Sequence, residues 1–394
     1  MILTVIFLSF SSFAQTKYCS TEASFSHEKK ILAPDGVSYF LRPSGKTKEV
    51  GFATLSGKNM IMNVQTGQST NVAGIIDPVP SPDGVLLAVP GDVVYLGADA
   101  TPKSPESISE EQLEKIEYRY TGSTQIVEKR RPNTLNWQPT TLTLSALKAQ
   151  KATYLASGMS FYTKDKSNPK AYNLTAFDAT VSENYQSLGV VKNVKETRYR
   201  MLYEGSKSIM LKEYTWNPSN QKLTPLGDAK PMCNTNTGIN SALPMLSKDG
   251  TEFSTYDPQS QSTKVYSIAT CAVVAEIPSL VGKIDFSPNG RFLAFHVDGG
   301  NKIGTNQFRL PKDDGTNLSL FLYDRKNKKL IPLKSQKRTD LYYPVFLSDD
   351  EIAYVSKNKD NEQFYITSAQ LEFSNLDNCG AAPKGKSETS KGVQ

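Results

Sequence analysis

The stretch KIDFSPNGRFLAFHVD, residues 283–298, contains two short apolar segments separated by a tight turn. Apolar and polar residues alternate on both sides of the turn, as in strands that have one buried face. The turn itself is Ser287-Pro288-Asn289-Gly290, and Asn-Gly permits the positive φ that a tight hairpin requires. The stretch therefore predicts a β-hairpin.

Similar stretches occur at four other places in the chain. They are ILAPDGVSYFL from Ile31, DPVPSPDGVLLAV from Asp77, LPMLSKDGTEFSTY from Leu243 and YPVFLSDDEIAYVS from Tyr343. Further hairpins follow most of them, as in residues 59–72 and 318–333. Two successive hairpins make four antiparallel strands, and a repeat of about 40 to 50 residues with four strands is typical of a β-propeller blade. We therefore predict an all-β fold, a β-propeller of four-stranded antiparallel blades.

The number of blades depends on the long segment between the corners at Ser81 and Ser247. It contains two sets of predicted strands, at 152–179 and 197–226, which we interpret as two degenerate blades. With the five visible corners they make seven blades, and six and eight stay open. Residues 104–120, SPESISEEQLEKIEYRY, carry a capping box and helical apolar spacing. We expect a helical insertion there that packs on the propeller rim.

The first fourteen residues, MILTVIFLSFSSFA, are apolar and then small. They are too short to span a bilayer, which needs about 20 residues, and they fit a secretory signal peptide. We expect residues 1–14 to be removed, 15–378 to form the propeller and 379–394 to be a disordered tail. The protein is then periplasmic or secreted, without membrane insertion, and we expect a monomer. The net charge of +6 is dispersed along the chain, which gives no support for nucleic-acid binding.

Four cysteines remain after that cleavage, and an even number in an exported chain favours disulfides. Four cysteines allow three pairings. If the N-terminal residues 20–27 fill the outer place of the last blade beside 364–373, Cys19 and Cys379 lie at the same rim. We predict a disulfide between them, and a second one between Cys233 and Cys271 across the fifth blade.

The corners SPDG and SPNG between alternating apolar strands resemble the repeat of TolB-type β-propellers, which are periplasmic proteins of bacterial cell envelopes. The resemblance covers residues 31–370 and implies a propeller and an envelope context. We expect no added N-terminal domain of the kind that TolB carries. The motif identifies the fold and says little about function.

Sequence motifs for chemistry are missing. The chain has no G-x-S-x-G, no H-E-x-x-H and no phosphate-binding glycine loop. Its two histidines, His27 and His296, lie in predicted strands and fit structural roles better than catalysis. We predict no catalytic residues, no metal and no cofactor.

We therefore favour a non-enzymatic scaffold for protein interactions in the bacterial cell envelope, whose partner is an envelope protein or is associated with peptidoglycan. The alternatives are a propeller enzyme (a glycoside hydrolase or lyase, or a lactonase-like enzyme) and a lectin-like glycan binder. The long loops at 299–315 and 334–343 are predicted to emerge side by side and to bind a partner with acidic groups. The residues of this predicted face are Lys302, Arg309, Lys312, Lys337, Arg338, Tyr342 and Tyr343.

Overall fold

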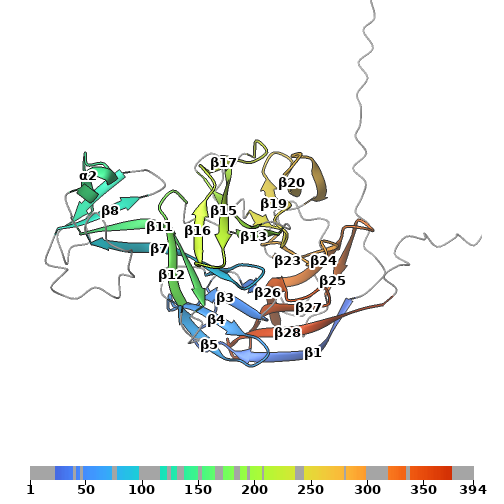
Figure 1. Ribbon diagram of the computed structural model, residues 1–394. Coiled ribbons are helices and arrows are strands. Elements are labelled where there is room, and N and C mark those ends of the chain that lie inside the picture. The colour runs from blue at the N-terminus through green and yellow to red at the C-terminus, as the bar shows by residue number, and fades with distance from the viewer. Residues whose placement is uncertain are drawn as a thin grey trace, which may run out of the picture.

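In the computed structural model, most of the described residues form strands that are grouped in small sheets (Figure 1). The described residues are 23–38, 41–44, 48–72, 78–96, 116–121, 126–130, 137–149, 153–164, 172–181, 187–192, 196–205, 208–235, 244–278, 281–298, 318–333 and 338–374. Within them the strands form six sheets, and each contains four strands in consecutive antiparallel order. The all-β propeller predicted from the sequence is confirmed.

The six sheets follow one another along the chain as blades 1 to 6, each from its inner to its outer strand. Blade 1 consists of β2 (Arg42–Ser44), β3 (Glu49–Ala53), β4 (Asn59–Asn63) and β5 (Ser69–Val72). Blade 2 consists of β6 (Val79–Pro80), β7 (Leu86–Leu96), β11 (Thr153–Lys164) and β12 (Tyr172–Asp178). Blade 3 consists of β13 (Ser187–Lys192), β14 (Thr197–Glu204), β15 (Ile209–Asn217) and β16 (Lys222–Pro225), with β17 (Lys230–Pro231) also paired to β15.

The remaining blades use the C-terminal half of the chain and its first described strand. Blade 4 consists of β18 (Met245–Leu246), β19 (Glu252–Asp257), β20 (Ser262–Ser267) and β21 (Val273–Ile277). Blade 5 consists of β22 (Asp285–Phe286), β23 (Phe292–Asp298), β24 (Leu318–Asp324) and β25 (Lys329–Pro332). Blade 6 consists of β26 (Thr339–Phe346), β27 (Glu351–Asn358), β28 (Phe364–Phe373) and β1 (Ala23–Leu32).

The ring is closed by its two ends. Strand β1 pairs antiparallel with β28, so the N-terminal strand completes the last blade, as the sequence predicted. The inner strands of neighbouring blades contact one another in the order β26, β2, β6, β13 and β18, and β22 contacts β26. Blades 4 and 5 share one hydrophobic cluster, which joins the two ends of this series.

The core lies between the blades. Each pair of neighbouring blades shares one cluster of buried apolar side chains, and the six clusters follow the ring from blade to blade. Between blades 5 and 6, for example, Phe292 and Leu322 pack with Phe346 and Tyr354. Because each blade has two apolar faces, it needs a neighbour on both sides to remove them from water.

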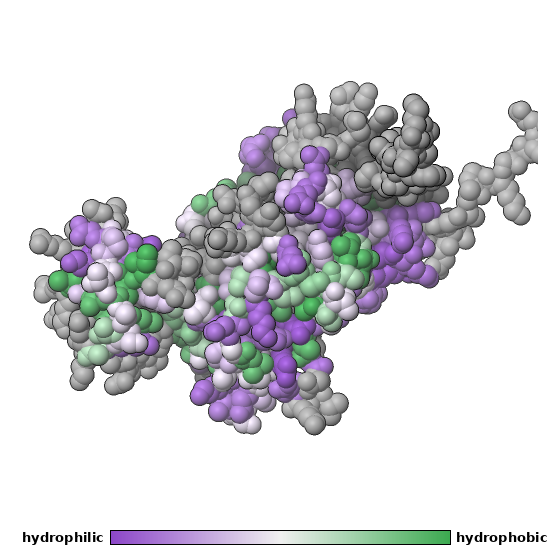
Figure 2. Space-filling model, turned by 90° about the horizontal axis from the view of Figure 1, so that it is seen from above, coloured by the Kyte–Doolittle hydropathy of each residue, from purple (hydrophilic) through white to green (hydrophobic). Residues whose placement is uncertain are grey.

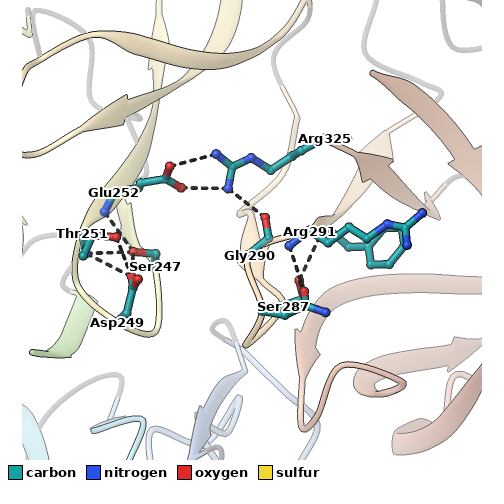
Figure 3. A network of polar contacts seen from close by, with 10 residues as sticks. Ser247, Asp249, Thr251, Glu252, Ser287, Gly290, Arg291 and Arg325 are labelled. Atoms are coloured by element: carbon teal, nitrogen blue, oxygen red, sulfur yellow. Dashed lines mark hydrogen bonds and ion pairs between the residues drawn. The ribbon is translucent and has the colours of Figure 1, made fainter. Parts of the chain in front are cut away.

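The repeated corners stabilise the first hairpin of several blades (Figure 3). In blade 4 the Ser247 hydroxyl donates to Asp249 Oδ1 at 2.6 Å and accepts the backbone N–H of Glu252 at 3.0 Å. The corner glycine, Gly250, has φ +67°, a conformation that residues with a Cβ rarely adopt. Ser81 and Ser287 make the equivalent bonds in blades 2 and 5.

An arm extends from blade 2. Strands β7 and β11 continue beyond the blade, and β8 (Glu117–Thr121), β9 (Ile126–Arg130), β10 (Gln138–Pro139) and helix α2 (Leu144–Ala149) belong to this extension. Strand β8 pairs with β11 in parallel. Figure 1 shows the arm projecting away from the blades. No helix in the described ranges is long and apolar enough to cross a bilayer.

The arm explains why the seven predicted blades are not confirmed. Residues 152–164 and 171–179 do not begin a new blade: they supply β11 and β12, the outer strands of the blade that starts at Ser81. The insertion between β7 and β11 makes one blade resemble two. The corner at Ala33 also differs from the prediction, since it connects β1 of blade 6 to β2 of blade 1.

The predicted helix at 104–120 falls mostly on residues 97–115, which lie outside the described ranges. Its last four residues form strand β8 instead, where Glu117, Tyr118, Arg119 and Tyr120 pair with β9. The predicted signal peptide and C-terminal tail also lie outside the described residues.

Blades 4 and 5 are joined by a charged contact that gives a testable prediction. Arg325 of blade 5 donates two hydrogen bonds to Glu252 of blade 4, at 2.8 and 2.9 Å, and one to the Gly290 carbonyl (Figure 3). Because both side chains are about four-fifths buried, we expect a coupling free energy of about 1.5 to 3 kcal/mol in a double-mutant cycle of Glu252→Gln and Arg325→Met.

The matched control is the ion pair between Arg338 and Asp360, whose side chains are 57% and 62% exposed. The corresponding cycle at this pair should give about 0 to 1 kcal/mol. Urea unfolding of the four variants of each cycle measures both values. Equal coupling at the two pairs would contradict the role assigned to the blade 4 to blade 5 contact.

Candidate functional site

A propeller enzyme that acts through carboxylates would hold them at the centre of the ring. Arg42, at the start of the inner strand of blade 1, reaches across the ring to Met245 of blade 4, with Nη1 3.3 Å from Sδ. Lys283, just before blade 5, donates to the carbonyl of Leu41 at 2.7 Å. Side chains from opposite blades therefore meet across the axis, and both Arg42 and Lys283 are buried.

The carboxylate of Asp285 lies two residues beyond Lys283, and its oxygens are bonded. Asp285 of blade 5 is buried, and it accepts hydrogen bonds from Lys248 Nζ at 2.7 and 2.8 Å. Its Oδ2 also accepts the backbone N–H of Phe346 in blade 6, at 2.7 Å. Burial lowers the pKa of Lys248, and the charge of Asp285 opposes this shift. The arrangement links three blades and does not form the pair of carboxylates that glycosidase chemistry requires.

The predicted partner-binding face is only partly within the described residues. Lys302, Arg309, Lys312 and Lys337 lie outside them. Arg338 is exposed and pairs with Asp360.

The two tyrosines of that face are less accessible than the sequence implied. Tyr342 is buried in the cluster between blades 6 and 1, and Tyr343 packs against the same cluster. Alternation along β26 and a bulge after Tyr342 turn both rings toward the protein. Arg338 is therefore the described residue that remains accessible on this face.

The two histidines lie in different blades. His27 is exposed on β1, at a bulge in its pairing with β28. His296 on β23 accepts the backbone N–H of Tyr343 at 3.4 Å, and its ring lies edge-on to that of Tyr343. A Cβ on Gly282 would lie 2.1 Å from the His296 ring, so this ring occupies the space that a larger residue at 282 would need.

The second predicted disulfide is present. Cys233 and Cys271 are bonded, with their Cα atoms 5.1 Å apart. Cys233 follows β17 and Cys271 lies in the turn between β20 and β21, so the bond joins blades 3 and 4 instead of crossing a fifth blade. Cys19 and Cys379 lie outside the described residues.

A cavity lies where the arm meets blades 2 and 3, and we call it the arm cavity. Its volume is about 360 Å³. Tyr120, Leu144 and Lys148 line it from the arm, and Phe161, Ala176, Phe177, Asp178, Ala179, Thr180, Lys212, Tyr214, Leu223 and Pro225 line it from the blades. Phe177 also packs into the small core of the arm, around Val127 and Leu147. The cavity is therefore a product of the insertion in blade 2.

The polar wall of the arm cavity is a network centred on Asp178. Lys212 Nζ lies 2.7 Å from Asp178 Oδ2, and the Tyr214 hydroxyl donates to the same oxygen at 3.0 Å. Thr180 donates to Oδ1 from its hydroxyl at 2.6 Å and from its backbone N–H at 2.9 Å. Lys212 also donates to the Thr180 hydroxyl.

The electrostatics of the arm cavity follow from burial. Burial alone raises the pKa of Asp178, but hydrogen bonds from Lys212 and Thr180 and the charge of Lys212 outweigh it and hold the pKa below its usual range. Burial, with the charge of Asp178, raises the pKa of Tyr203 to about 12 and that of Tyr214 well above its usual value. Asp178 is therefore a carboxylate and both tyrosines are neutral phenols at neutral pH.

Sequence reasoning missed this network. Lys212 lies on the same face of β15 as the buried Tyr214, an unusual place for a lysine, and this was the available signal. Its partner Asp178 belongs to another blade, and nothing local in the sequence connects the two.

Comparisons with known proteins add little to this description. No family model matches the chain, and no curated protein matches it. Among solved structures, the chain is similar to the β-propeller domain of Cps50 (Swd1) from Myceliophteria thermophila, with 9% identity and a TM-score of 0.38. The match covers 86% of this chain and 98% of that domain. The fold is assigned from the sheet order and the closed ring, and not from this likeness.

The Asp178–Lys212 pair gives a prediction about stability and pH. Asp178→Asn leaves the buried ammonium of Lys212 without its counter-ion and should lower the free energy of unfolding at pH 7 by about 3 to 5 kcal/mol. The folded pKa of Asp178 is below its unfolded value of about 3.9. The stabilisation is therefore complete above the unfolded pKa and is lost as the pH falls through the folded pKa.

Urea titrations from pH 7 to pH 3 should show a constant difference between wild type and Asp178→Asn down to about pH 5, and a shrinking difference below it. The double variant Asp178→Leu/Lys212→Met removes both charges and should recover most of the loss. A difference that does not change with pH would show that the ionised carboxylate is not what stabilises the fold.

Proposed function

We propose that this protein is an exported, non-enzymatic β-propeller that acts as a protein-interaction scaffold in the bacterial cell envelope. The contact between Arg42 and Met245 across the axis carries the proposal, because it occupies part of the centre of the ring, where a propeller enzyme would hold substrate. Asp285, the carboxylate near the axis, is engaged by Lys248 and by the backbone of Phe346. The proposal therefore assigns function to the outer surface of the ring.

The ring is suited to present loops and the arm in fixed positions. Every pair of neighbouring blades shares an apolar cluster, and a disulfide joins blades 3 and 4. Surface loops on such a scaffold are common sites of binding. Export and the envelope location are supported by the apolar N-terminal segment and by the resemblance of the SPDG and SPNG corners to TolB-type propellers.

The partner is expected to present acidic groups to the predicted face. A test is affinity capture from the envelope fraction with the tagged mature protein, compared with the triple variant Lys302→Glu/Arg309→Glu/Arg338→Glu. Charge reversal should abolish capture, and raising the salt concentration should weaken capture by the wild type. Tyr342 is left unchanged because it is buried, and its loss would disturb the core.

Two further variants make this test selective. Lys222→Glu/Lys230→Glu changes exposed charges on blade 3 and should capture the partner normally. Ile116→Ser/Ile126→Ser changes two exposed apolar residues of the arm, which carries apolar surface in Figure 2. Loss of capture by this arm variant, with normal capture by the triple variant, would show that the predicted face is the wrong one.

The absence of catalysis is a separate prediction. A screen of esterase, peptidase and glycosidase substrates with the purified mature protein should give rates equal to those of the buffer. Turnover that disappears in Asp285→Asn, but not in Asp257→Asn on β19 of blade 4, would establish an active site at the axis and overturn the proposal.

A further inference from the structure

The wall of the arm cavity is mostly apolar, and aromatic rings reach it from the arm and from the blades. Tyr120 belongs to β8 of the arm, and Phe161, Phe177 and Tyr214 belong to blades 2 and 3. An apolar cavity of about 150 Å³ holds one benzene ring, and ligand sites usually measure about 300 to 1,000 Å³. A volume of about 360 Å³ therefore has room for a body of two fused rings.

The charged groups of the wall already have partners inside the protein. Asp178 of blade 2 pairs with Lys212 of blade 3 at 2.7 Å, as Lys248 of blade 4 pairs with Asp285 of blade 5, and both pairs link neighbouring blades. Lys148, the other charged residue among the described lining residues, also has an interaction within the protein. An ionic ligand would lose its hydration and find no unpaired counter-charge, so the wall favours an uncharged ligand.

One polar group of the wall has no such partner. Tyr214 donates its hydroxyl hydrogen to Asp178, whereas the hydroxyl of Tyr120 makes no hydrogen bond within the described part of the chain. Burial raises the pKa of Tyr120, and neither a hydrogen bond nor a charge adds to this shift. A tyrosine hydroxyl can both donate and accept a hydrogen bond. Tyr120 therefore offers a neutral hydrogen-bonding group beside the aromatic wall.

We propose that the arm cavity binds an uncharged small molecule with a body of one or two rings and a hydroxyl or carbonyl group. The body packs among the aromatic rings from the arm and from blades 2 and 3, and its oxygen forms a hydrogen bond with the Tyr120 hydroxyl. The Asp178–Lys212 pair holds the blades that carry the wall and is not the group that recognises the ligand. This site is additional to the scaffold function and does not depend on it.

The test uses the purified mature protein and four probes that share a two-ring body. At pH 7, 2-naphthol and decahydro-2-naphthol are neutral alcohols, naphthalene has no polar group and 2-naphthoate is an anion. Binding of 2-naphthol is followed by its fluorescence, and the other probes compete with it. At least one alcohol should bind, and it should bind at least about tenfold tighter than 2-naphthoate, because the anion would enter without a counter-charge.

A conservative variant isolates the hydrogen bond. The wild type should bind 2-naphthol about fivefold tighter than naphthalene, the effect of one ordinary hydrogen bond. Tyr120→Phe should remove this preference and leave the affinity for naphthalene unchanged. The matched control is Tyr118→Phe, because Tyr118 lies on the same strand, packs in the core of the arm and is not part of the cavity wall. This control should keep the preference.

A second variant places the binding in the arm cavity. Ala176→Phe adds a ring to the wall from β12 without changing its charge, and it should abolish binding of all four probes. Its control, Ala275→Phe, adds a ring on β21, the outer strand of blade 4, and should bind 2-naphthol as the wild type does. Thermal unfolding of each variant confirms that it is folded.

Four results would overturn the proposal: neither alcohol binds, 2-naphthoate binds as tightly as the alcohols, Tyr120→Phe keeps the preference for 2-naphthol over naphthalene, or Ala176→Phe leaves binding unchanged. Loss of envelope-partner capture by Ala176→Phe in a protein that binds none of the probes would identify the cavity as a docking pocket for protein, and would also overturn the assignment. Because the probes are tested without a partner, failure here and failure of the scaffold proposal are distinguishable.

Discussion

The antiparallel pairing of β1 with β28 is the contact on which the rest of the ring depends. A four-stranded blade has two apolar faces, and an open row of blades would leave one face of the first and one face of the last in water. Completing blade 6 with the N-terminal strand brings blade 6 against blade 1, where Val50 and Phe52 pack with Val355 and Ile366. The closure is long-range in sequence, so folding must bring the two ends of the chain together before the last apolar faces are buried.

Polar contacts then set the angle between blades. Asp83 in the corner of blade 2 accepts a hydrogen bond from the Tyr199 hydroxyl of blade 3 at 3.1 Å. Arg200 of blade 3 donates to the Gly250 carbonyl in the corner of blade 4 at 2.7 Å, and Asp349 of blade 6 accepts the backbone N–H of Asn289 in blade 5. The same corners that close hairpins within blades thus offer groups to neighbouring blades. Apolar packing alone would tolerate small rotations of one blade against the next, and directional hydrogen bonds do not.

Local features were predictable from the sequence and long-range ones were not. The corners at Ser81, Ser247 and Ser287 have a local signal, since turn chemistry and alternation act over a few residues. The predicted seven blades are not confirmed, because an insertion of strands between β7 and β11 separates the two halves of blade 2. Alternation of apolar and polar residues does not show which sheet a strand joins. Tyr342 was placed on the predicted partner-binding face and is buried, for the related reason that a bulge changes which face of the strand a side chain occupies. The arm cavity could not be predicted for both reasons. The insertion contributes one of its walls, and two different blades supply Asp178 and Lys212.

The arm also changes what the rim of the propeller can do. The outer strands β12 and β16 of blades 2 and 3 contact each other, and Phe177 of β12 is shared between the core of the arm and the wall of the cavity. Gly158 on β11 shows how closely the supporting backbone is packed, since a Cβ there would lie 2.5 Å from the carbonyl oxygen of Asp178. The backbone that carries Asp178 therefore packs closely on β11, and Tyr120 of β8 with Leu144 and Lys148 of α2 line the cavity from the arm. The fixed backbone and the hydrogen bonds from Thr180 and Tyr214 hold the Asp178 carboxylate in one place, and this carboxylate in turn positions the Lys212 ammonium of blade 3.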